Sequence, residues 1–136
     1  MSLLQNMIYT LGYQLESLKD PYKELVVTHG LPSTAPTELT IAVEHEDTAS
    51  DQQYELAGYR KRTHVFVADI YALDKGQRCD LIEAVKNLLE DKNLPVVDIA
   101  KQDTGHIMTC EGITGKVNLE QPLQARMNIH FSILIN

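Results

Sequence analysis

Cysteine is scarce in this sequence: the chain has two cysteines, and it has no tryptophan. Cys79 and Cys110 lie far apart and lack the close spacing of metal-binding or redox pairs. A secreted chain of this size that depends on disulfides usually has more cysteines. We therefore expect both thiols to be reduced.

Long apolar runs are missing as well. No stretch comes near the roughly 20 consecutive apolar residues that a membrane helix needs. The N-terminal segment MSLLQNMIYTLGYQL carries polar side chains throughout and no basic segment, so it does not predict a signal peptide. We expect no membrane partner, and a place in the cytosol or in an assembled particle.

Positive charge is in deficit. The chain has 12 Lys and Arg residues against 19 Asp and Glu residues, which gives a net charge of -7. The one basic run, Arg60-Lys61-Arg62, precedes a predicted strand and is typical of a solvated strand start. Binding to nucleic acid needs clustered cations at the phosphates. The composition therefore argues against a dedicated DNA- or RNA-binding module.

Catalytic and metal-binding motifs are not found. The sequence has no GxSxG, no GxGxxG and no phosphate-binding GxxxxGK[ST] pattern. His45 lies within Glu44–Asp47, but neighbours on a strand point to opposite faces and do not converge on one ion. His106 and Cys110 lie four apart on a predicted strand, about 13 Å from one another. We expect no enzyme activity, no cofactor and no metal.

Two amphipathic helices are predicted. Residues 2–19 carry apolar side chains at three- and four-residue spacing, and Ser2 with Gln5 forms a capping pattern. Residues 74–91 show the same spacing, and Asp74 with Gln77 provides a second capping pattern. Each helix has one apolar face, which must pack on something else.

The strands show two kinds of pattern. The final segment, QARMNIHFSILIN, alternates between apolar and polar residues as far as Ser132, which indicates a strand with one buried face. Residues 39–45 alternate in the same way, and residues 24–29 predict a shorter strand. Residues 61–72 are apolar on both faces, so we expect helices on one side of this strand and a partner or second layer on the other.

These elements indicate one α+β domain over residues 1–136. We expect a mainly antiparallel sheet with two helices packed on one face, in the order α-β-(loop)-β-α-β-β-β. The acidic stretch at about 45–58 has no strong period, and we interpret it as a mobile connection whose far end pairs as a strand. Gly105, Gly112 and Gly115 are expected turn or bulge points in the last third.

The layout resembles that of the small neck proteins of tailed bacteriophages, the tail-terminator and head–tail joining families. The resemblance is carried by the run KRTHVFVADIYA at 61–72 and by DKGQRCDLIEAVKNLLE from Asp74, which leads into the second helix. It covers nearly the whole chain. These families share the helix, the strand, the long loop, the strand leading into a sheet-packing helix and the terminal hairpin.

The resemblance implies a virion protein that forms a ring, commonly a hexamer, which caps the tail tube and joins it to the head. Its partners would be copies of itself, tail-tube proteins and head-connector proteins, while DNA passes without specific binding. An acidic lumen would suit such a duct. The residues that we expect at these contacts are Glu44, Glu46, Asp47, Asp51, Tyr54, Arg60, Arg62, Val65, Val67 and Tyr71.

Other classes stay open on the sequence alone. A head-completion or minor capsid protein would share the same layout. A free-standing cytosolic interaction or ligand-binding domain would be monomeric or dimeric, with residues 45–58 lining a pocket. A metal-dependent hydrolase would use the Glu44–Asp47 group and would contain bound metal after purification.

Overall fold

The structure is a computed structural model. It describes the backbone of residues 2–32, 34, 36–46, 52–56, 59–117, 121 and 123–135, and the side chains of these residues except 52–56, 59, 60 and 135. Within this part of the chain, no helix is both long and apolar enough to cross a membrane.

Both predicted helices form, and both capping patterns are confirmed. Helix α1 spans Leu3–Glu16, is followed by a 3-10 turn at Ser17–Lys19, and begins where the Ser2 hydroxyl accepts a hydrogen bond from the Gln5 amide at 3.2 Å. Helix α2 spans Lys75–Leu89, and the Asp74 carboxylate accepts from the Gln77 amide at 2.7 Å. Each cap satisfies one amide that the first helical turn leaves without a partner.

One sheet of seven strands runs through the molecule. Its path is β1-β2-β4-β7-β6-β5, and β3 pairs with β4 beside that path. The strands are β1 (Val26–His29), β2 (Thr40–His45), β3 (Gln52–Leu56), β4 (Tyr59–Tyr71), β5 (Asn93–Val97), β6 (Asp103–Val117) and β7 (Gln124–Ile135).

The predicted fold class, α+β with a mainly antiparallel sheet, is confirmed. The edge strand β1 runs parallel to β2, and the remaining strand pairs are antiparallel. The sheet is therefore mixed. The far end of the expected loop forms β3, so the stretch 45–58 contributes a strand to the sheet, while residues 47–51 and 57–58 lie outside the described residues.

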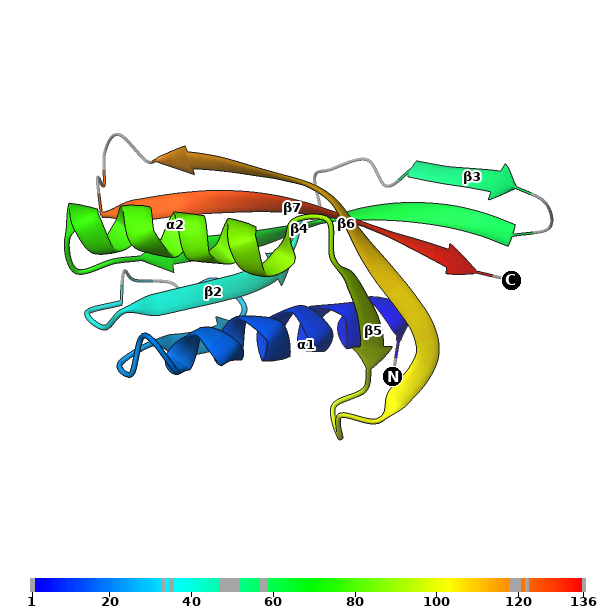
Figure 1. Ribbon diagram of the computed structural model, residues 1–136, viewed down its shortest axis with the longest axis horizontal. Helices are drawn as coiled ribbons and strands as arrows, with labels where there is room; N and C mark the ends of the chain where they lie inside the picture. Colours follow the sequence, from blue (N-terminus) through cyan, green and yellow to red (C-terminus); the bar gives the residue numbers. More distant parts are fainter. Residues whose placement is uncertain are drawn as a thin grey trace.

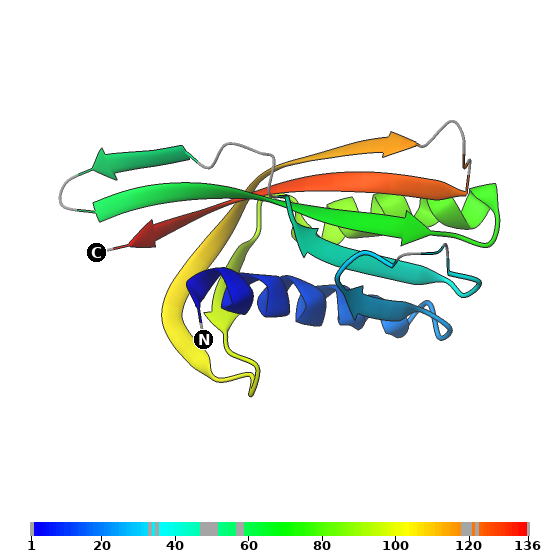
Figure 2. The same cartoon turned by 180° about the vertical axis from the view of Figure 1, so that it is seen from behind.

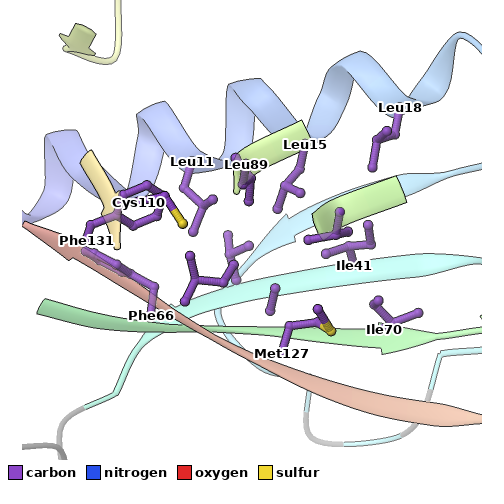
Figure 3. Close-up of a cluster of buried hydrophobic side chains, with 14 of the residues drawn as sticks. Leu11, Leu15, Leu18, Ile41, Phe66, Ile70, Leu89, Cys110, Met127 and Phe131 are labelled. Atoms are coloured by element: carbon purple, nitrogen blue, oxygen red, sulfur yellow. The ribbon is translucent and has the colours of Figure 1, made fainter. Parts of the chain in front are cut away.

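The alternation of the last strand sets its register as predicted. Ala125, Met127, Ile129, Phe131 and Ile133 are at most 1% exposed and face the helices. The same face of β4 contributes Phe66, Ala68 and Ile70. The two phenyl rings meet edge to face with centroids 5.9 Å apart, in the cluster shown in Figure 3. Gly112 marks a bulge in β6, as expected from its position in the sequence.

Helix α1 lies between the two outer strands of the sheet, because it contacts both β1 and β5. The Thr10 hydroxyl accepts a hydrogen bond from the Val97 amide at 2.9 Å, and the Tyr13 hydroxyl donates to the Ile99 carbonyl oxygen at 2.8 Å. Figures 1 and 2 show the sheet curving so that α1 and α2 occupy one side of it. The opposite side of the sheet has no helix from the described residues packed over it.

Candidate assembly surface

Two surfaces of the sheet are not packed against helices. The first is the open face, formed by the side chains of β2, β4 and β7 that alternate with those packed under α1 and α2. Figure 2 shows the three strands from behind. The second is the arm, formed by β3, residues 59–63 of β4 and residues 134–135 of β7, where the sheet narrows to three strands. The arm extends beyond the helices in both views (Figures 1 and 2).

The open face contains four of the residues expected at subunit contacts. Val67 lies opposite Glu44 of β2, and Val65 and Tyr71 follow on the same side of β4. Val67 is 3% exposed, whereas the Glu44 side chain is exposed. Glu46, just past β2, is half-buried, and its amide donates a hydrogen bond to the Val65 carbonyl oxygen at 2.9 Å. A predicted strand with two apolar faces is thus confirmed, with helices on one face only.

An ion pair that the sequence did not predict lies in the middle of the open face. Asp69 and Arg126 are directly opposite on β4 and β7, and the guanidinium donates two hydrogen bonds to the carboxylate, at 2.8 and 2.9 Å. The Asp69 side chain is 1% exposed and the Arg126 side chain 45% exposed. The hydrogen bond to Asp69 raises the pKa of Arg126. Burial, and then the Asp69 charge, raises the pKa of Tyr71.

A second ion pair crosses the strands near the arm. Lys61 Nζ lies 2.7 Å from a carboxylate oxygen of Glu111, the residue carried outward by the bulge in β6. Hydrogen bonds from Lys61, and then from Ser132, lower the pKa of Glu111. This pair ties the root of the arm to β6, although Glu111 lies distant from Lys61 in the sequence.

The other described contact candidates belong to the arm, where the strand register gives their positions. Tyr54 pairs with Lys61, and Arg60 pairs with Ile135 at the outer end of β7. Arg62 lies opposite Ile133, so it is on the helix side of the sheet and not on the open face with Val65 and Val67. The ten candidates therefore do not form one patch. Asp47 and Asp51 lie outside the described residues.

The histidines do not form a metal site within the described residues, where no group of three His, Cys, Asp or Glu side chains could hold an ion. His45 instead packs against His64 and Phe66, with ring centroids 5.7 and 5.6 Å away. The buried Cys110 thiol has its pKa raised by burial, which disfavours the reactive thiolate. Cys79 is exposed on α2.

A shallow cleft between α1 and the β1–β2 edge is a candidate for a small-molecule site. Its volume is about 250 Å³, below the roughly 300–1,000 Å³ of usual ligand pockets. Tyr9 and His29 meet edge to face in its wall, with centroids 5.3 Å apart, and Glu44 lies at its rim. The polar groups are few, and the cleft contains no arrangement of nucleophile and base.

Comparison with known proteins gives a structural match only. No protein-family model matches this sequence, and no curated protein matches it. Among solved structures, a chain from the virion of a native gene transfer agent particle is similar, with a TM-score of 0.61 and 12% sequence identity. The alignment covers 95% of this chain and 93% of that one. The two chains share a fold.

The shared fold extends over nearly the whole of each chain, because little of either is left out of the alignment. At 12% identity the residues themselves are mostly different. The likeness therefore does not extend to individual contacts such as the Asp69–Arg126 pair or to the charges of the arm.

Proposed function

We propose that this chain is a structural protein of a phage-like virion, and that it forms a ring in the neck that caps the tail tube and joins it to the head. The observation that carries the proposal is the near-complete structural likeness to a chain of a gene transfer agent virion. The layout of the sequence, which resembles that of tail terminators, supports the same assignment.

The two surfaces that have no described helix over them support assembly. A closed ring requires each subunit to present two different surfaces to its two neighbours. The open face and the arm are two such surfaces on one small domain. Leu134 on the arm and Ile107 on β6 are 55% and 57% exposed, which adds apolar area that a partner would cover.

The charge of the chain supports a role around DNA without binding it. A net charge of -7 repels a polyanion at long range, so a duct built from such subunits would let DNA pass. We propose that partners of this ring are tail-tube and head-connector proteins, and that the protein works in the virion and not as an enzyme.

The oligomeric state of the purified protein tests the ring. Native mass spectrometry and negative-stain electron microscopy should show a cyclic oligomer, alone or with tail-tube subunits. In the mixture, the ring should sit at one end of each tube and limit tube length. A monomer under all these conditions would contradict the proposal.

A head-completion or minor capsid protein is the second candidate, because the similar chain belongs to a whole virion, in which the head, neck and tail are all built from structural proteins. The same microscopy separates the two candidates. Rings at the ends of tubes support the tail terminator, whereas binding to portal or capsid proteins with no effect on tubes supports the other role.

A further inference from the structure

The outer edge of the arm is a row of backbone groups without a partner strand. Within the described residues β3 pairs with β4 alone, and β1 accompanies β2 only as far as Val43. The other outer strands, β1 and β5, both contact α1. Such open edges readily pair with another chain.

The direction of the backbone groups on β3 follows from the neighbouring ladder. The Val65 carbonyl oxygen accepts from Glu46, so odd-numbered residues of β4 direct their backbone groups toward the β2–β3 side. Hydrogen bonding alternates along an antiparallel pair. Lys61 and Thr63 therefore bond to their β3 partners, and Gln53 and Glu55 direct their backbone groups outward.

Charge separates the arm from the rest of the molecule. The arm contains three basic residues, Arg60, Lys61 and Arg62, and one acidic residue, Glu55. The remainder of the chain has nine basic and 18 acidic residues. A basic projection on an acidic body is complementary to the body of a second copy of the same chain.

We propose that the arm docks by its β3 edge on the acidic body of a second copy of this chain. The inference rests on the proposed ring and names the contact that builds it. Arm and body are different surfaces, so head-to-tail repetition of this contact gives a ring or a filament.

Two single substitutions test the two parts of this contact. Gln53→Pro removes an outward-directed amide and keeps the bonds to β4, and Arg62→Glu reverses one arm charge. Each should raise the protein concentration at half-assembly by at least about tenfold, measured by light scattering coupled to size exclusion. Arg62→Lys should retain assembly.

Matched controls make the result specific to the arm. Gln53→Ala keeps the outward amide and should assemble like the unaltered chain. Lys23→Glu makes the same charge change at an exposed position of the body, and because it makes the body more acidic it should not weaken assembly. Circular dichroism and thermal unfolding must show that each arm variant is folded. An arm variant that is unfolded is replaced by Gln53→Glu, which adds a charge that the acidic body repels and leaves the backbone unaltered.

The outcomes separate the two proposals. No oligomer from the unaltered chain contradicts the ring itself. Rings that persist unchanged in folded Gln53→Pro and Arg62→Glu variants leave the ring standing and overturn the arm contact. Retention of a DNA duplex that is lost in Arg62→Glu, with assembly unchanged, would assign the arm to nucleic acid and overturn the inference as well.

Discussion

At the scale of single residues, the Asp69–Arg126 pair is the most consequential contact of the open face. A carboxylate that is 1% exposed needs a partner, because burying an unpaired charge is costly. The guanidinium supplies two hydrogen bonds to it and remains half-exposed itself. Asp69 therefore depends on Arg126 for these two hydrogen bonds within the open face.

Replacing Arg126 should show how far the buried Asp69 carboxylate depends on its cation. Arg126→Met leaves the Asp69 carboxylate buried without its cation, and we expect the free energy of unfolding to fall by about 1–3 kcal/mol. The same change in an Asp69→Asn background should cost much less. Urea unfolding of the four chains at neutral pH measures the coupling. Equal losses in both backgrounds would show that the pair does not stabilise the fold.

The Lys61–Glu111 pair predicts a dependence on pH. The pKa of Glu111 is lower in the folded chain than in the unfolded one, because Lys61 and then Ser132 stabilise the charged form. Its contribution is therefore complete above about pH 5 and is lost as the pH falls through the folded value. Since both side chains are partly exposed, the contribution is below about 1 kcal/mol.

The free energy of unfolding of the Glu111→Gln variant, measured across the acid range, tests this pH dependence. The stability difference between the variant and the unaltered chain should be largest near neutral pH and should shrink below about pH 4. Lys61→Met should show the same profile. A difference that is constant with pH would mean that the Glu111 charge does not contribute.

At the scale of elements, the contact between α1 and β1 rests on one glycine. A Cβ atom added to Gly12 would lie 2.5 Å from Cε1 of His29, so the close approach of the histidine ring requires glycine here. Glycine within a helix costs up to about 1 kcal/mol relative to alanine. This cost in helix stability accompanies the packing of His29 against the helix surface, beside Tyr9.

A double-mutant cycle tests whether the contact with His29 requires glycine at position 12. In a His29→Ala background, Gly12→Ala should stabilise the chain by about 0.5–1 kcal/mol, through helix propensity alone. With His29 present, the gain should be smaller or reversed, because the ring is displaced. Thermal unfolding of the four proteins gives the coupling. Additive effects would show that Gly12 is not required for the contact.

The local patterns of the sequence predicted helices, caps and the last strand because each signal lies within a few residues. The Ser2 and Asp74 caps and the alternation of β7 are of this kind. The short strands β1 and β3 gave weaker patterns in the sequence. The parallel pairing of β1 depends on contacts with β2 that no local pattern encodes.

The candidate surface was predicted in part for the same reason. Val65, Val67 and Tyr71 share a face because side chains alternate along one strand. The Asp69–Arg126 pair joins two strands that are distant in the sequence, and its discovery needs the register between them. A search for opposite charges on the polar face of β7 and on the central strand would have suggested it.

At the scale of the whole molecule, separation of charge between arm and body predicts that assembly responds to salt. Attraction between exposed charges is screened over about 10 Å at 0.1 M salt and about 3 Å at 1 M. The concentration at half-assembly should therefore rise with sodium chloride, and the rise should be smaller in Arg62→Glu. Light scattering over a salt series measures both slopes. Assembly that strengthens with salt would indicate a contact dominated by apolar surface.

The position of α1 has a consequence for how the chain reaches its native state. The helix is synthesised early, yet the groups that Thr10 and Tyr13 bond, at Val97 and Ile99, follow much later in the chain. Closing so long a loop is a slow, non-local step. The part of α1 that packs on β5 therefore stays uncovered until the second half of the sheet has been synthesised, whereas β1 and β2 are available to the helix earlier.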